Sequence, residues 1–275
     1  MGKLFPVLDS DVGQRIIKSI KFDLTHLDFD IIGIYSELIY GTVKSKLLSQ
    51  PNFPSEIFFF KRFFHQFYAE NPKGTQWRQI IEPKQPILSS LQDLETRFSE
   101  PLCLIDVGCG PTTQFFTDAI IKKFNVKVTT VDPLAEFYNG LHKKYHTGYD
   151  LTCLKGTGET LQEMFPENNF HLVYTENAID HSQDPVKFVN NIVHITKPGG
   201  YIIMQGFINE GTAENWLGLH QWDIDIEHDH LHLSNRDKSI NSVDMMKNLP
   251  LGVVSSEVAG HNIWDRYSII YQKGI

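Results

Sequence analysis

The sequence predicts an α/β fold, in which a doubly wound and mostly parallel seven-stranded sheet has an antiparallel last strand and follows an N-terminal helical cap. Two observations predict this fold. Up to about residue 100, apolar residues recur at intervals of three and four, which is the period of helices. Beyond it, short apolar strands alternate with helical segments, which is typical of βαβ units. We therefore expect a cap or lid segment over residues 1–98 and a sheet domain over residues 99–275.

The cap contains four segments with helical spacing. They cover residues 11–22, 30–49, 55–70 and 87–98. The third segment holds a dense aromatic run between Phe58 and Tyr68, whose spacing covers more than one helix face. The run suits a core between the cap and the sheet. The alternatives are a lid, an apolar wall of a binding site, or the interface of a homodimer.

Seven strands are expected in the sheet domain, the last two of them antiparallel to each other. Their ranges are 102–107, 126–132, 152–156, 170–176, 199–207, 251–260 and 263–273. Helices are expected between them over residues 112–124, 134–146, 160–165 and 184–197. The segment Lys197-Pro198-Gly199-Gly200 marks the turn before the fifth strand. A hairpin insertion at about 220–235 and a short polar helix over 241–248 precede the closing strands.

Composition excludes several classes of protein. The chain has 275 residues, 41% of them hydrophobic, and a formal net charge of −8, so it is expected to fold but not to bind nucleic acid in general. No apolar run approaches the roughly 18 to 20 residues of a membrane span, and the N-terminus lacks the apolar stretch of a signal peptide. Three cysteines are too few for a disulfide framework. We expect a cytoplasmic protein without stable membrane insertion.

The strongest local signal is the Gly108-Cys109-Gly110 turn, which follows a buried strand and precedes a helical segment. Glycines there let the backbone approach a ligand closely, and a helix N-terminus offers free N–H groups. The second strand ends at Asp132, 22 residues after Gly110. An acid at that position accepts both hydroxyl hydrogens of a ribose. Together these features predict a nucleoside cofactor.

The residues around the turn favour one class of cofactor. In dinucleotide dehydrogenases a third glycine allows close helix–strand packing, and here that position is Thr113. Asp106 lies two residues before the first glycine, where its carboxylate would repel a pyrophosphate and attract a cationic amino-acid tail. Both residues count against a nicotinamide-dependent oxidoreductase, which is the rival hypothesis.

Five motifs occur in the order found in a known family. They read DVGCGPT, VDP, GTGETL, LVYTENAIDH and HITKPGGYIIM. The chain thereby resembles the class I S-adenosylmethionine (SAM) dependent methyltransferases, a Rossmann-like superfamily, over roughly residues 100–207 and the closing strand pair. The resemblance implies that residues 99–275 bind SAM and that the protein is a methyltransferase (EC 2.1.1.-).

The resemblance also implies cofactor-binding residues. The methionine end of SAM is expected at the loop of Asp106, Gly108, Cys109 and Gly110, the ribose at Asp132, the adenine at Pro133, Thr157, Gly158 and Glu159, and the reacting centre at Glu176 and Asn177. Many family members have Asp at the position of Thr157, so Thr157 or Glu159 is expected to take over the contact with the adenine amino group. Arg78 is a further candidate, as a partner of the SAM carboxylate, and its alternative is a surface position.

The candidate catalytic residues are Asp180 and His181, which follow the fourth strand at the edge where α/β sites form. If the acceptor is a hydroxyl or an ammonium, a proton must leave, and His is the usual base near neutral pH. Asp180 is suited to bind a polar acceptor. The alternative is that His181 caps the following helix. His220 and Trp222 are candidate substrate-binding residues, with packing as the alternative role of Trp222.

The sequence therefore predicts a SAM-dependent enzyme that moves a methyl group to an oxygen, or a nitrogen, of a small molecule by in-line displacement. A non-catalytic SAM-binding or interaction protein is the second rival. The stretch Glu227–His232 holds three histidines at alternate positions. We expect no metal there, because a hairpin tip would break their alternation and no Cys is near.

Overall fold

The computed structural model describes residues 83–145, 149–216, 219–261 and 264–274. The first three helices expected in the cap, together with the aromatic run, lie outside these residues. In chain order the elements are α6 Gln85–Arg97, β1 Leu102–Val107, α7 Asp118–Ile121, β2 Val126–Asp132, α8 Ala135–Tyr145, β3 Leu154–Lys155, the 3₁₀ helix η1 Gly158–Thr160, α9 Leu161–Met164, β4 Phe170–Glu176, α10 Pro185–Ile195, β5 Thr196–Phe207, α11 Glu210–Ala213, β6 Trp222–Glu227, β7 His230–Asn235, β8 Val243–Asp244, β9 Leu251–His261 and β10 Trp264–Lys273.

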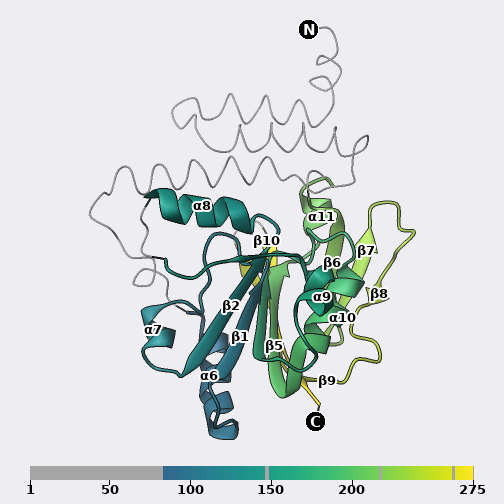
Figure 1. Ribbon diagram of the computed structural model, residues 1–275. Coiled ribbons are helices and arrows are strands. Elements are labelled where there is room, and N and C mark those ends of the chain that lie inside the picture. Colours follow the sequence, from purple (N-terminus) through teal and green to yellow (C-terminus); the bar gives the residue numbers. More distant parts are fainter. Residues whose placement is uncertain (1–82, 146–148, 217–218, 262–263, 275) are drawn as a thin grey trace, which may run out of the picture. The chain divides into compact units, whose positions relative to one another are not determined.

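Seven strands form one sheet in the order β3-β2-β1-β4-β5-β10-β9, as Figure 1 shows from one side. The pairs β2–β3, β1–β2, β1–β4 and β4–β5 are parallel, whereas β10 is antiparallel to both β5 and β9. Six strands thus run in one direction and the last in the other. The predicted fold class is confirmed. The strand order reverses between β1 and β4, and sites in such folds form at the carboxyl ends of the strands beside this point.

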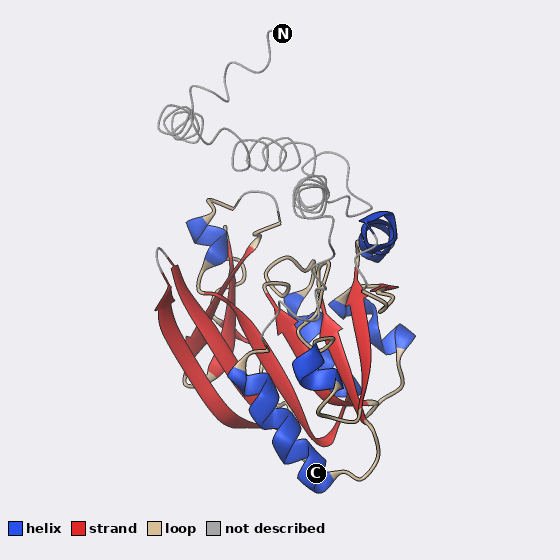
Figure 2. Ribbon diagram, turned by 90° about the vertical axis from the view of Figure 1, so that its left-hand side faces the viewer, coloured by secondary structure: helices blue, strands red, loops and turns tan. Residues whose placement is uncertain are grey.

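The sheet has an apolar core on each face, because its central strands are buried on both sides. On one face Leu102 and Leu104 of β1 pack with Ile87, Leu91 and Leu94 of α6. The other face carries a second cluster, to which α9, α10 and the smaller sheet contribute (Figure 2). Helix α6 falls within the segment expected to be a cap, yet its apolar side is part of the sheet core.

At the turn expected before the fifth strand, the pairing between β4 and the start of β5 shifts its register. Phe170 of β4 pairs with Thr196, but Leu172 pairs with Tyr201, so residues 197–200 of β5 lie opposite the single residue His171 of β4. Gly199 has a φ of 76° there, a value that other residues rarely adopt. The strand resumes its register at Tyr201 and carries the chain to the carboxyl edge at Phe207.

Two expected helices are wrong. Residues 112–117 do not form a helix, and α7 is limited to Asp118–Ile121 because Thr117 is extended with a φ of −113° and a ψ of 154°. Residues 241–248 form β8 and turns, with left-handed φ values of 48° at Ser242 and 63° at Asn248. The neighbouring Met245 and Met246 are both buried in the core cluster, which a polar surface helix would not allow.

Strands β6, β7 and β8 form a separate antiparallel sheet. The turn between β6 and β7 has left-handed φ values of 51° at His228 and 64° at Asp229, which suit a two-residue hairpin. Its apolar side chains Ile224, Leu231 and Leu233 join the main core.

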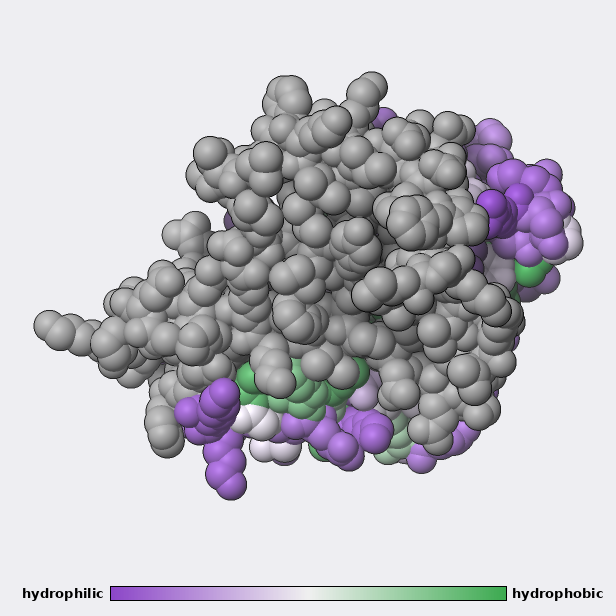
Figure 3. Space-filling model, turned by 90° about the horizontal axis from the view of Figure 1, so that it is seen from above, coloured by the Kyte–Doolittle hydropathy of each residue, from purple (hydrophilic) through white to green (hydrophobic). Residues whose placement is uncertain are grey.

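Figure 3 shows hydrophilic stretches and a hydrophobic patch on the part of the described surface that is visible from above. Among the helices within the described ranges, none combines the length and apolarity needed to cross a membrane.

Candidate functional site

The loop after β1 is built on two glycines with left-handed backbones, φ 72° at Gly108 and 61° at Gly110. The Gly108 N–H donates to the carbonyl of Val131 at 2.8 Å, which ties the loop to β2. A Cβ at Gly108 would lie 2.4 Å from the Cβ of Ala178, whereas a Cβ at Gly110 would meet nothing within 4 Å. Gly108 is therefore needed for packing against the loop after β4. Gly110 borders open space, where a ligand can approach the backbone.

Asp132 ends β2 directly beside this loop. Its Oδ2 accepts from the Gly110 N–H at 2.9 Å, and its Oδ1 accepts from the Leu134 N–H at 2.7 Å. Burial raises the pKa of Asp132 to about 6, although both backbone donors act against the rise. Pro133 follows in a half-buried turn. The structure thus brings together the two positions, Gly110 and Asp132, that the sequence pattern joined only by spacing.

Asp106 lies near the end of β1 and is 3% exposed. Burial raises its pKa to about 8, and the nearby charges of Glu176 and Asp132 add to the rise. A cation that binds beside Asp106 would stabilise the ionised carboxylate and lower this pKa. The site therefore favours a positively charged ligand group.

Glu176, the last residue of β4, lies in a polar network that the sequence did not indicate. Its Oε1 accepts from Lys84 Nζ at 2.5 Å and also pairs with the Arg266 guanidinium. Its Oε2 accepts from the Tyr174 hydroxyl at 2.5 Å. Burial acts to raise the pKa of Glu176, but Lys84, Tyr174 and Arg266 outweigh it and hold the pKa below its usual value. Glu176 is thus an ionised, fully partnered carboxylate.

No sequence pattern could identify Lys84 and Arg266 as partners of Glu176. Lys84 precedes α6 and Arg266 lies on β10, so both are far from Glu176 along the chain. Burial lowers the pKa of Lys84, although Glu176 opposes the shift. Lys84 Nζ also donates to the Gln205 Oε1 at 2.6 Å. Arg78, the cation that the sequence suggested, lies outside the described residues. Lys84 is thus a described basic side chain at the carboxyl ends of β4 and β5.

Asn177 follows Glu176 with a φ of 49°, and its N–H donates to the carbonyl of Gln205 at 3.0 Å. Its side-chain oxygen is buried and has no hydrogen-bond partner among the described residues. A buried acceptor without a donor costs about 1 to 3 kcal/mol. A ligand N–H or O–H at the end of β4 would satisfy it.

The segment Thr157–Glu159 is held by its own neighbours. Thr157 precedes η1, and its N–H donates to the Thr160 hydroxyl oxygen at 3.0 Å. A Cβ at Gly158 would lie 2.0 Å from the ring of Phe188, so this glycine permits α10 to pack closely. The Glu159 Oε1 accepts from the Gln183 N–H at 2.7 Å. These contacts position the loop after β3, and the adenine contacts of the three residues stay a prediction.

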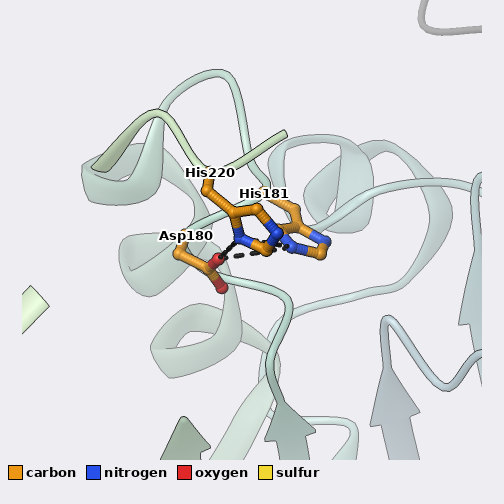
Figure 4. Close-up of side chains that lie close together, drawn as sticks. All are labelled: Asp180, His181 and His220. Carbon is orange, nitrogen blue, oxygen red and sulfur yellow. Dashed lines mark hydrogen bonds and ion pairs between the residues drawn. The ribbon is translucent and has the colours of Figure 1, made fainter. Parts of the chain in front are cut away.

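Three side chains converge after β4, as Figure 4 shows. Asp180 and His181 come from the loop between β4 and α10, and His220 comes from the segment between α11 and β6. The Asp180 Oδ2 lies 3.1 Å from His220 Nδ1 and 3.3 Å from His181 Nε2, and the two ring nitrogens are 3.2 Å apart. The sequence assigned Asp180 and His181 to catalysis and His220 to the substrate, and the structure joins all three.

Glu210 is a fourth member of this cluster that the sequence did not indicate. Its Oε1 lies 3.5 Å from His220 Nδ1. Burial raises the pKa of Glu210, and the charge of Asp180 adds to the rise. For Asp180, burial acts in the same direction, but the charges and hydrogen bonds of His181 and His220 prevail and lower its pKa. Asp180 is thus the ionised carboxylate and Glu210 the protonated one.

Trp222 contacts the loop that carries Asp180 and His181. Its indole N–H donates to the carbonyl of Ser182 at 2.9 Å, and its ring packs against the main core. The Ser182 hydroxyl in turn donates to the carbonyl of Ile179 at 2.6 Å. Trp222 therefore fixes the loop that carries Asp180 and His181, while its substrate contact stays a prediction.

The histidines of the hairpin do not converge. His230 Nδ1 lies 2.9 Å from an Asp244 oxygen, and His232 Nδ1 lies 2.9 Å from the Ser242 hydroxyl. His228 occupies the turn. Each ring thus faces a different partner, as expected for side chains around a hairpin tip.

Comparison with known proteins places this site in context. Residues 105–204 match a family model described as a methyltransferase domain. A ubiquinone biosynthesis O-methyltransferase of Rhodopseudomonas palustris is 26% identical over 214 residues, which are 68% of this chain and 80% of the relative. An uncharacterized methyltransferase of Schizosaccharomyces pombe is 31% identical over 106 residues, which are 36% of this chain and 37% of the relative.

A solved structure with a similar chain course is the 1,6-didemethyltoxoflavin-N1-methyltransferase of Burkholderia thailandensis. The TM-score is 0.45 at 12% identity, over 83% of this chain and 92% of the other.

Proposed function

We propose that this chain, which is a class I SAM-dependent methyltransferase, transfers the methyl group of SAM to an oxygen of a small-molecule acceptor. The observation that carries the proposal is the cluster of Asp180, His181 and His220 at the carboxyl end of β4. It offers a proton acceptor beside an ionised carboxylate, which a hydroxyl acceptor requires. The relative of Rhodopseudomonas palustris is named as an O-methyltransferase, and this name agrees with an oxygen acceptor.

The strand ends fit SAM, whose sulfonium supplies an electrophilic methyl group. The buried carboxyl of Asp106 is suited to the cationic methionine end of SAM, and Asp132 is suited to the ribose hydroxyls. Gly110 leaves room for the ligand, and the unpartnered oxygen of Asn177 is available to a donor at the reacting end. Lys84, which donates to Glu176 and Gln205, is a described cation at these strand ends, and the role of Arg78 stays a prediction.

The cluster handles the proton of the acceptor. His181 takes the hydroxyl proton at a ring nitrogen while the acceptor oxygen attacks the methyl carbon. Asp180 is ionised and lies 3.3 Å from His181 Nε2, so it stabilises the imidazolium that forms. His220 contacts the same carboxylate oxygen and thereby orients the Asp180 side chain. The remaining work is positioning and exclusion of water.

A His181→Ala variant tests the proposal. We expect turnover with hydroxyl acceptors to fall by about 100-fold or more, because general-base catalysis contributes about 10² to 10⁴. SAM affinity, measured by calorimetry, should be nearly unchanged. His230→Ala is the matched control, since His230 also contacts a carboxylate but lies at the hairpin. Unchanged turnover in His181→Ala, or products methylated at nitrogen alone in a screen of hydroxyl and amine acceptors, would contradict the proposal.

A further inference from the structure

The geometry after β4 points to a metal site: we propose that Asp180, His181 and His220 bind one divalent transition-metal ion of the Zn²⁺ class, with Glu210 as a fourth carboxylate in reach. The three ligand atoms all lie within 4.8 Å of one another. The sequence predicted no metal, because it drew attention to the histidines of the hairpin and not to a pair that folding brings together from positions 181 and 220. This inference deepens the proposed function and rests on it only for the role of the ion in methyl transfer.

The three ligand atoms form a triangle whose size suits a metal ion. Its sides are 3.1 Å, 3.2 Å and 3.3 Å. Ligands about 2.1 Å from a zinc ion are about 3.4 Å apart in a tetrahedron and about 3.0 Å apart at the adjacent corners of an octahedron. The observed triangle lies between these two values. An ion about 1 Å above its plane would therefore be within bonding distance of all three atoms.

No arrangement of protons on the two rings alone satisfies all three contacts of the triangle. Each ring nitrogen presents either one hydrogen or one lone pair in its ring plane. If both rings donate to Asp180, the contact between His181 Nε2 and His220 Nδ1 has two donors and no acceptor. If one ring donates to the other, the accepting nitrogen presents its lone pair to the ionised carboxylate of Asp180. A cation attracts all three atoms at once.

The ligands are held in place by other parts of the fold. Asp180 is 5% exposed, and the loop that carries it is tied to Trp222 through the carbonyl of Ser182. The side chains of His181 and His220 are 25% and 14% exposed. The site is thus preorganised on the buried side and reachable from solvent on the other. Catalytic metal sites keep such an open position for water or substrate.

The donor set decides the class of ion. Two imidazoles with one carboxylate suit zinc and its transition-metal neighbours, whereas Mg²⁺ and Ca²⁺ prefer oxygen ligands alone. Glu210 Oε1 is 3.5 Å from His220 Nδ1, close enough to occupy a fourth position after a small movement.

A bound ion would change how the acceptor loses its proton. The acceptor hydroxyl would coordinate at the open position, where its pKa falls as that of a zinc-bound water does. The proton passes to solvent, the oxygen attacks the methyl carbon, and the bond from that carbon to sulfur breaks. His181 is then a ligand of the ion, so in the metal-bound protein coordination of the acceptor hydroxyl replaces the proton transfer to His181 that the proposed function describes. The acceptors that suit this arrangement are small molecules with an ionisable hydroxyl, such as phenols.

The test is metal binding by the tag-free full chain after removal of metals with a chelator. We expect calorimetry to show one tight Zn²⁺ per chain, and Co²⁺ to give the visible absorption of a site with nitrogen and oxygen ligands. His220→Ala should weaken Zn²⁺ binding at least tenfold and remove the Co²⁺ spectrum. His220→Gln serves as a second variant that preserves volume if the first does not fold. His230→Ala is the matched control and should bind like the unaltered chain.

Two outcomes overturn the inference: no stoichiometric Zn²⁺ binding by the unaltered chain, or equal binding by both His220 variants. Loss of binding in His230→Ala alone would place the ion at the hairpin and equally refute it. A chelated enzyme that still methylates hydroxyls at full rate would refute the role of the ion while leaving the proposed function intact. Tight Zn²⁺ binding that depends on His220, without methyl transfer to any hydroxyl, would refute the proposed function while leaving the metal site intact.

Discussion

The two glycines of the loop after β1 lead to a prediction that separates packing from ligand binding. Both have left-handed backbones, so alanine is strained at either position by about 1 to 2 kcal/mol. Of the two, only Gly108 has no room for a side chain, since its Cβ would lie 2.4 Å from the Cβ of Ala178. Relieving such a contact adds a cost of about 1 to 3 kcal/mol. We therefore expect Gly108→Ala to lose about 2 to 5 kcal/mol of unfolding free energy and Gly110→Ala about 1 to 2 kcal/mol.

The effect on SAM should follow the opposite order once stability is allowed for. The space beside Gly110 is where we place the cofactor, so a methyl group there should weaken SAM binding at least tenfold although the fold is little affected. The assay is urea denaturation followed by circular dichroism, with SAM titration of each folded variant by calorimetry. Gly140→Ala is the control: this helical glycine of α8 has nothing within 4 Å of its Cβ position, and alanine should stabilise it by about 0.5 to 1 kcal/mol.

The reasoning is refuted if Gly110→Ala destabilises the chain as much as Gly108→Ala does. It is also refuted if Gly110→Ala binds SAM as tightly as the unaltered chain, because the open space would then not belong to the cofactor.

Two further predictions concern the carboxylates of the site. Because burial raises the pKa of Asp106 to about 8 and a bound cation favours its ionised form, SAM affinity should rise with pH by up to about tenfold per unit until pH 8 or so. Calorimetry should find this rise lost in Asp106→Asn, and an unaltered slope would disprove the assignment. Asp132→Ala should weaken SAM binding by removing the acceptor for the ribose hydroxyls and the bond to the Gly110 N–H. Undiminished affinity would mean that Asp132 does not contact the ribose.

Much of the sheet was predictable because a parallel strand buried on both faces must be a short apolar run. β1 and β4 were predicted at their observed bounds for this reason, and the bounds of β2, which is buried only toward its carboxyl end, were predicted as well. The failures lie where backbone conformation is decided by neighbours. Residues 112–117 have helical composition, yet they follow a loop held to β2 and Asp132. Residues 241–248 look polar, yet the pairing of β8 with β7 carries two methionines into the core.

The sequence by itself determined the fold class and predicted the glycine loop after β1, because glycine spacing, strand periodicity and the acid at the end of β2 are local properties that the chain carries wherever it folds. Only the tertiary structure decided which side chains meet after β4. His181 and His220 are 39 residues apart, and they meet Asp180 and Glu210 only because two loops close over the end of the sheet. Lys84 and Arg266 reach Glu176 in the same way. Contacts between distant segments depend on how the strand ends converge in space, and no local pattern encodes them.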